Sequence, residues 1–240
     1  MLLISMSTIE KDFDRLARLD SQGWSANNHY HNLLLRYVPE ECGRALEVGC
    51  GTGGFSRRLA ARANHVTAID LSAEMIRVAR SRSDQFPNIE FNVADAMSCD
   101  FPAGHFDCIA TIATLHHVPT EQALEKLKEA LRPRGTLLVL DLVELNRNIL
   151  TAEGLGDTFL NTLALAASCG LRLLHNGRLR PPPEVRAAWE EHGKKDSYLT
   201  IREAGELYER LFPGAMIRRH LFWRYSVVWQ KSPPNRGANG

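Results

Sequence analysis

Two hydrophobic periods alternate along most of this chain. Residues 7–38 place apolar side chains three and four positions apart, as in FDRLARLD and YHNLLLRYV, and this spacing predicts helices. From residue 44 onward, helical patterns alternate with short apolar runs, namely RALEV, HVTAID, IEFNV, FDCIATI and TLLVLDL. Runs of this kind, separated by helices, are typical of strands in a parallel sheet that is buried on both faces.

The pattern changes after the fifth run. Residues 144–212 predict helices and loops, interrupted by three prolines at 181–183. Within 215–230, the stretches AMIRRHLF and WRYSVVWQ predict two strands too close together for a crossover helix, so they should pair antiparallel. The composition of residues 232–240 is typical of a disordered tail. We therefore predict one α/β domain over residues 1–231. It should contain a Rossmann-like, seven-stranded, mostly parallel sheet with an antiparallel terminal strand, helices on both faces, and a helical insertion between strands five and six.

Charge and hydropathy narrow the range of partners. The chain has 29 basic and 28 acidic side chains, a formal net charge of +1. Binding to nucleic acid through phosphate contacts usually needs a stronger basic excess, so we expect no such partner. We interpret Arg218, Arg219 and Arg224 as part of a solvated strand face. The apolar segments MLLISM and TLALAASCGL are too short for a signal peptide or a membrane span, so we expect no membrane partner and a cytoplasmic location.

The cysteines and histidines form no recognisable metal motif. The five cysteines are scattered and never form a CxxC pair, which argues against disulfides and zinc and favours a reducing compartment. His29 and His31 lie two positions apart in a predicted helix and therefore point to different faces. We expect no metal site.

The segment ALEVGCGTGG is the most informative motif. Gly49, Gly51 and Gly53 allow a sharp turn and a close approach of the backbone to a ligand. The next residues, FSRRLAARA, predict a helix whose free N–H groups and dipole would face that ligand. Open α/β sheets bind nucleotide-like ligands at such a junction. The loop alone is ambiguous, because Gly49, Gly51 and Gly54 also fit the GxGxxG dinucleotide fingerprint, and Asp70 could bind a ribose in either case.

Further motifs separate the two interpretations. Glu47 precedes the first glycine by two residues, Asp95 closes the third apolar run, and LHHV follows the fourth. As a set, the motifs resemble those of the class I S-adenosylmethionine (SAM)-dependent methyltransferases. ALEVGCGTG, VTAIDLS, NVADAM, FDCIATIATLHHV and LRPRGTLLVLDL are similar to the first to fifth motifs of that family. The resemblance covers residues 44–142 and is closest to members that methylate small molecules.

The resemblance implies a SAM cofactor bound by residues 44–142, a helical lid over residues 1–38, and a small-molecule methyl acceptor covered by the insertion. The implied cofactor-binding residues are Glu47, Gly49, Cys50, Gly51, Gly53, Asp70, Leu71, Asp95, Ala96 and Ile112. His116 is the candidate catalytic residue, acting as a general base or orienting the acceptor. A structural role is the favoured interpretation for His117. Ser72 is a better N-cap than Asp70 for the helix SAEMI, which leaves Asp70 free for a ligand.

Two alternative functions stay open. An NAD(P)-dependent oxidoreductase would share the glycine loop, but the sequence has no YxxxK pair, no GxxxxGK[ST] loop and no HExxH motif. A non-catalytic SAM-binding module would share every cofactor motif. Trp24 and Tyr30 are interpreted as hydrophobic packing. Residues of the insertion that could line an acceptor pocket or fill the core are Phe159, Leu163, Trp189 and Tyr198. No motif identifies the acceptor or the oligomeric state.

Overall fold

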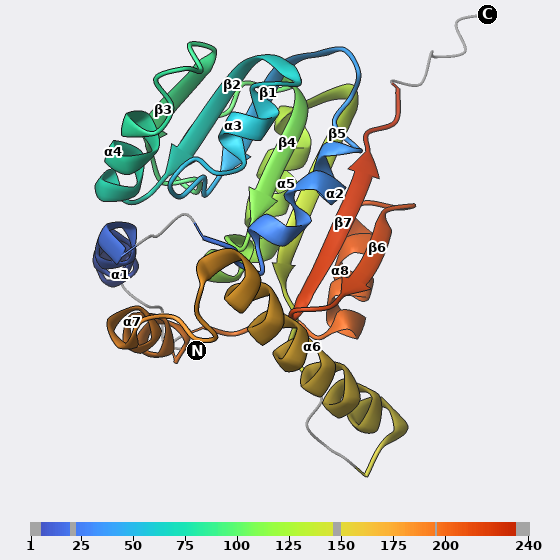
Figure 1. The fold of residues 1–240 in the computed structure, drawn as a ribbon. Helices are drawn as coiled ribbons and strands as arrows, with labels where there is room; N and C mark the ends of the chain where they lie inside the picture. The colour runs from blue at the N-terminus through green and yellow to red at the C-terminus, as the bar shows by residue number, and fades with distance from the viewer. Residues whose placement is uncertain (1–5, 20–22, 146–149, 195, 234–240) are drawn as a thin grey trace, which may run out of the picture.

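A seven-stranded sheet forms the centre of the molecule (Figure 1). The computed structural model describes residues 6–19, 23–145, 150–194 and 196–233. The strands are β1 (Cys42–Val48), β2 (Ala63–Asp70), β3 (Ile89–Val93), β4 (Phe106–Ile112), β5 (Leu131–Leu142), β6 (Met216–His220) and β7 (Arg224–Gln230). Their order is β3-β2-β1-β4-β5-β7-β6, and β7 runs antiparallel to both β5 and β6. The predicted sheet is confirmed, including the antiparallel pair at its edge.

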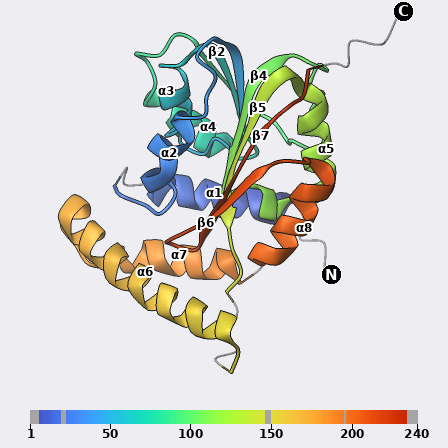
Figure 2. The same ribbon diagram turned by 90° about the vertical axis from the view of Figure 1, so that its right-hand side faces the viewer.

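Helices cover both faces of this sheet. The α-helices among the described residues are α1 (Met6–Leu19), α2 (His31–Leu35), α3 (Ser56–Leu59), α4 (Ala73–Ser81), α5 (Thr120–Ala130), α6 (Ala152–Asn176), α7 (Pro183–Gly193) and α8 (Ile201–Leu211). Short 3-10 helices are η1 (Asn28–Tyr30) and η2 (Leu115–His117). With the sheet seen nearly edge-on, α2 and α3 lie on one side and α5 and α8 on the other (Figure 2).

Neighbouring strand residues point into separate hydrophobic layers. On β1, Leu46 packs in one cluster with Leu124 of α5 and Tyr208 of α8, whereas Ala45 packs in another with Leu34 of α2. All four apolar residues and Tyr208 are fully buried. Because both faces are covered, the strands are apolar at successive positions, which explains their continuous hydrophobic runs.

The N-terminal segment is interrupted, so the prediction of helix throughout residues 7–38 is wrong. Residues 23–27 form a loop and a turn between α1 and η1. Ser25 and Asn28 bond to each other twice: the Ser25 N–H donates to Asn28 Oδ1 (2.8 Å), and the Asn28 N–H donates to Ser25 Oγ (3.2 Å). Short polar side chains of this type compete with helical backbone bonds.

Two element boundaries also differ from the prediction. The helix expected over FSRRLAARA is a single turn, Ser56–Leu59, and β2 already begins at Ala63. The Asn88 amide donates to the carbonyls of Ala60 and Ala63, which supports the chain where it leaves the helix. One turn has little dipole, so the expected helix-dipole contribution is not supported. The strand predicted as TLLVLDL begins earlier, because the preceding RPRG lies within β5, where Arg134 has a φ of 66°.

The carboxyl ends of β1, β2, β4 and β5 point toward one edge of the sheet, and α1, α6 and α7 lie beyond that edge (Figure 1). Of the helices within the described residues, none is long and apolar enough to cross a membrane. The helices at this edge enclose the site described next.

Candidate active site

A cavity of about 960 Å³ lies at the carboxyl edge of the sheet. This volume is near the upper end of the range for small-molecule sites, about 300–1,000 Å³. Strand-end residues Val48, Asp70, Ile112 and Leu142 contribute to one wall. Residues of α1, α6 and α7 contribute to the other. The cavity therefore joins the glycine loop to the N-terminal segment and the insertion.

The glycines of the loop have different roles. Gly49, Gly51 and Gly53 have φ values of 73°, 51° and 74°, in the left-handed region that favours glycine. A Cβ on Gly49 would lie 2.0 Å from Thr114 Oγ1, and one on Gly53 would lie 3.0 Å from the Phe91 ring. A Cβ on Gly51 would have no neighbour closer than 4.0 Å, and Gly51 lines the cavity. Gly51 therefore leaves room for a ligand, whereas Gly49 and Gly53 are required by packing.

Asp70 ends β2 with its carboxylate beside the loop. Its Oδ2 accepts a hydrogen bond from the Gly51 N–H (2.8 Å), and its Oδ1 accepts one from the Ser72 N–H (2.9 Å). Burial raises the pKa of Asp70, and these two N–H donors oppose that effect. Ser72 is the N-cap of α4, accepting from the Met75 N–H as predicted. Asp70 thus fixes the loop while it lines the cavity.

Glu47 lies beneath the loop and is buried. The Ser56 hydroxyl donates to Glu47 Oε2. Burial raises the pKa of Glu47 to about 8, the Ser56 bond lowers it, and the nearby charge of Asp70 raises it further. A positively charged ligand beside this buried carboxyl group would favour its ionised form and so lower its pKa.

Asp95 follows β3 and is half-buried. Its Oδ1 accepts a hydrogen bond from the Met97 N–H (2.9 Å), and the Ser98 hydroxyl donates to its Oδ2 (2.7 Å). These bonds fix the carboxylate at the cavity wall beside Ala96.

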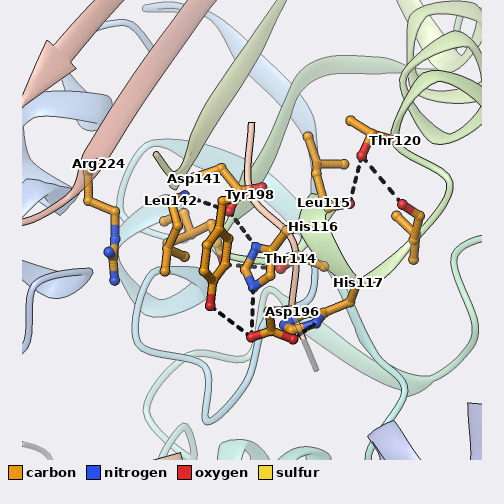
Figure 3. Close-up of polar contacts among 12 residues, drawn as sticks. Thr114, Leu115, His116, His117, Thr120, Asp141, Leu142, Asp196, Tyr198 and Arg224 are labelled. Atoms are coloured by element: carbon orange, nitrogen blue, oxygen red, sulfur yellow. Dashed lines mark hydrogen bonds and ion pairs between the residues drawn. The ribbon is translucent and has the colours of Figure 1, made fainter. Parts of the chain in front are cut away.

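His116 lines the cavity and is held in place by Asp141 (Figure 3). Its Nδ1 lies 2.6 Å from Asp141 Oδ1, which also accepts a bond from the Leu142 N–H. An ionised carboxylate only accepts hydrogen bonds, so the bonded Nδ1 carries a proton, and in the neutral ring Nε2 is the nitrogen with the free lone pair. That Nε2 faces Asp196 at 3.9 Å.

Further polar side chains surround Asp196. His117 Nδ1 lies 3.4 Å from Asp196 Oδ1, His192 Nε2 lies 3.8 Å from Oδ2, and the Tyr198 hydroxyl donates to Oδ2 at 2.9 Å. Burial lowers the pKa of His117. Burial would raise the pKa of Asp196, but contacts with His117, His192 and His116 outweigh it and lower the pKa. We call His116, His117, His192 and Asp196 the histidine cluster.

Comparison with known proteins identifies the family. A family model described as a methyltransferase domain matches residues 45–135. An uncharacterized methyltransferase of Mycobacterium tuberculosis (strain H37Rv) is 35% identical over 212 residues, covering 87% of this chain and 98% of that protein. The chain belongs to the class I SAM-dependent methyltransferase family. Membership leaves the oxidoreductase alternative without support.

Other methyltransferases match this one over different lengths. The ubiquinone/menaquinone biosynthesis C-methyltransferase UbiE of Pseudomonas aeruginosa is 32% identical over 133 residues, which cover 50% of this methyltransferase and 52% of UbiE. A solved structure named the DhpI-SAM-HEP complex aligns with a TM-score of 0.62 at 18% identity, covering 95% of this chain and 98% of DhpI. The structural likeness shows the shared fold.

Most predicted site residues of this methyltransferase lie in the cavity wall. Gly53 lies outside it, and the wall includes Glu47, Gly49, Cys50, Gly51, Asp70, Leu71, Asp95, Ala96, Ile112 and His116. His117 also lines the cavity, with its Nδ1 3.4 Å from Asp196 Oδ1, and its structural role stays a prediction.

The aromatic candidates divide between cavity and other positions. Trp24, Trp189 and Tyr198 line the cavity. Tyr30 is buried and its hydroxyl donates to the Leu221 carbonyl, which agrees with a packing role. Phe159 is 70% exposed on α6, outside the cavity wall, so it neither lines the pocket nor fills the core.

Arg224 shows why the strand face at 218–224 is not simply solvated. It is buried, its Nε donates to Asn27 Oδ1 (2.8 Å), and burial lowers its pKa to about 10. The turn before β7 brings Arg224 into the cavity wall instead of toward water. Its contact with Asn27 joins residues 197 positions apart in the sequence, and no local signal predicts it.

Proposed function

We propose that this methyltransferase transfers the methyl group of SAM to a small molecule that carries a negatively charged group. The observation that supports the proposal most strongly is the single cavity. One wall holds the predicted cofactor residues, and the other is built by the insertion. A cavity of about 960 Å³ has room for two small ligands side by side.

The residues at the loop end fit a nucleoside with a cationic amino-acid portion. The Asp70 carboxylate lines the cavity and keeps acceptor capacity beyond its backbone bonds, so ribose hydroxyls could donate to it. Asp95 is placed to accept from an exocyclic amino group, and Gly51 leaves space at the loop. Buried Glu47 complements positive charge. Bound there, SAM would supply an electrophilic methyl group on a sulfonium ion.

The insertion wall suggests the charge of the acceptor. Arg172, Arg178 and Arg180 line the cavity from α6 and the segment after it. The Arg172 guanidinium lies over the Trp24 ring, 5.6 Å from its centroid. Arginine and an aromatic ring together bind a carboxylate or phosphate attached to an apolar body well.

The residues of this chain contribute mainly alignment. The glycine loop and Asp70 fix one reactant, while the insertion wall and the histidine cluster fix the other. Near-attack positioning of two reactants is worth up to about 7–11 kcal/mol. Asp141 orients the ring through Nδ1, so in its neutral form His116 would present the lone pair of Nε2 to the acceptor. Burial of the cluster excludes water from that end.

Isothermal titration tests the cofactor assignment. SAM and its demethylated product, S-adenosylhomocysteine, should both bind, because most contacts are to groups they share. NADH serves as the comparison ligand. Binding of NADH without binding of either SAM compound would refute the assignment.

Fractionated metabolites test the acceptor class. A small-molecule extract is separated on an anion-exchange resin, and each fraction is added to protein and SAM. Release of S-adenosylhomocysteine should occur with the retained fraction. Arg178→Ala with Arg180→Ala should raise the acceptor KM, whereas Arg186→Ala, which lies on α7 outside the cavity and pairs with Glu190, should not. Activity confined to the unretained fraction would contradict an anionic acceptor.

A further inference from the structure

Three imidazoles and a carboxylate meet in the cavity wall from two distant segments. His116 and His117 belong to η2, while His192 is near the end of α7 and Asp196 follows it. Candidate ligand atoms of His116, His117 and Asp196 all lie within 4.8 Å of one another. The four side chains are between 5% and 8% exposed.

Of the three histidines, only His117 approaches Asp196 closely enough for a weak hydrogen bond, and the other two spacings are too wide for one. From Asp196 oxygens, the distances are 3.4 Å to His117 Nδ1, 3.8 Å to His192 Nε2 and 3.9 Å to His116 Nε2. Hydrogen bonds between such groups are usually 2.7–3.2 Å long. When two ligand atoms each lie about 2.0–2.1 Å from one tetrahedral zinc ion, the two ligand atoms are about 3.3–3.4 Å from each other. The His117 distance already equals the second spacing, whereas His116 and His192 would each have to move closer to Asp196 to share one ion.

His192 provides an independent indication. Its Nε2 is buried and has no hydrogen-bond partner within the part of the chain that the structure describes. A buried nitrogen without a partner is energetically unfavourable, so a native site normally satisfies it. Asp196 Oδ2 is the nearby acceptor, and it already accepts from the Tyr198 hydroxyl. A cation between His192 and Asp196 would satisfy both.

In two of the cluster histidines, the ring nitrogen that points away from Asp196 faces another carboxylate, as is usual for metal-bound histidines. A histidine that binds a metal through one nitrogen usually presents the other to a carboxylate. His116 presents Nδ1 to Asp141 at 2.6 Å, and His192 presents Nδ1 toward Asp12 at 3.6 Å. In each case the nitrogen that faces Asp196 is the opposite one.

We propose that His116, His117, His192 and Asp196 form a binding site for one divalent transition-metal ion of the zinc type. Imidazole-rich sets suit zinc, cobalt, nickel and iron, whereas calcium and magnesium prefer oxygen ligands. The sequence predicts no metal site, because its ligands are separated by about 75 positions along the chain. The proposal rests on the cluster alone and not on methyl transfer. If both hold, His116 acts on the acceptor through the ion.

Metal binding is measured directly on the whole chain. The protein is stripped with a chelator, dialysed, and titrated with Co²⁺ while visible absorption is recorded; Zn²⁺ content is then measured by mass spectrometry. We expect one ion per chain, the intense bands of tetrahedral cobalt, and thermal stabilisation by Zn²⁺. Asp196→Asn and His192→Gln should each weaken binding at least about tenfold. His175→Gln is the matched control, since His175 lines the same cavity outside the cluster.

The results separate the possibilities. Absence of both cobalt bands and Zn²⁺ stabilisation in the wild type would overturn the proposal, whatever the variants do. Unchanged metal affinity in folded Asp196→Asn, or an equal loss in His175→Gln, would also overturn it, because the ion would lie elsewhere. SAM titration of the stripped protein reports on the cofactor site independently.

Discussion

Replacing Asp70 by alanine should weaken SAM binding more than any other single change outside the glycine loop. The carboxylate of Asp70 accepts from the backbone N–H groups of Gly51 and Ser72 and has a further backbone contact with Leu71, so at least one of its about four acceptor positions is left for a ligand. A hydrogen bond to a charged group contributes about 1.5–3 kcal/mol. Loss of one such bond corresponds to about a ten- to hundredfold rise in Kd.

The same substitution also removes the acceptor of the Gly51 N–H. The variant should therefore be less stable, and its SAM affinity must be compared with that of a control variant that loses a structural carboxylate elsewhere in the fold. Asp107 is suitable: its Oδ2 accepts from the Arg44 N–H (2.8 Å), its Oδ1 pairs with Arg132, and it lies near the opposite end of β4. Asp107→Ala should lose stability and keep its SAM affinity.

The assay is isothermal titration with SAM at fixed ionic strength, after a thermal unfolding scan of each variant. A folded Asp70→Ala protein with wild-type affinity would refute the reasoning, and Asp70 would then only support the loop. An equal loss in Asp107→Ala would also refute it, because the effect would follow stability.

Three other predictions concern the same cavity. Gly51→Val should lose SAM binding, since its side chain would occupy ligand space, and its φ of 51° should also lower the melting temperature. Gly49→Ala should lower the melting temperature because its Cβ would overlap Thr114. Titration of the folded variants and thermal scans measure the two effects, and normal SAM binding by Gly51→Val would count against the loop geometry. Glu47 has a native pKa of about 8 against an ordinary 4.5, so between these pH values the native state binds more protons than the unfolded state. The free energy of unfolding of the ligand-free protein should therefore fall by up to about 1.4 kcal/mol for each pH unit from 4.5 to 8. Denaturant titrations should show this slope in the wild type and not in Glu47→Gln, and equal slopes would contradict the burial argument. His116→Asn should lower kcat about hundredfold through misplacement of the acceptor while SAM affinity stays constant; wild-type turnover would remove His116 from the acceptor end.

The sheet was predictable because its signals are local. Continuous apolar runs indicate strands covered on both faces, and the close spacing of the last two runs requires an antiparallel pair. The loop and its carboxylates were predictable for the same reason: each follows directly from the end of a strand. Gly53 was assigned to the cofactor site, yet its neighbour is the Phe91 ring, a packing constraint that the motif does not reveal.

The acceptor end depends on contacts between distant segments. His192 and Asp196 carry no motif, and only the fold of the insertion brings them to His116 and His117. Arg224 similarly reaches Asn27 across the chain. Side-chain bonds between Ser25 and Asn28 interrupt a segment whose apolar spacing is helical, so periodicity alone could not locate that break.

Transfer of an isotopic label tests the central claim most directly. The purified protein is incubated with SAM bearing a deuterated methyl group and with an extract that contains small molecules, proteins and nucleic acids, and the fractions are then analysed by mass spectrometry. We predict a deuterated methyl group on an anionic small molecule, with loss of this product in Gly51→Val. Label found only in the protein or nucleic-acid fraction, or no transfer by protein that binds SAM, would contradict the proposed function.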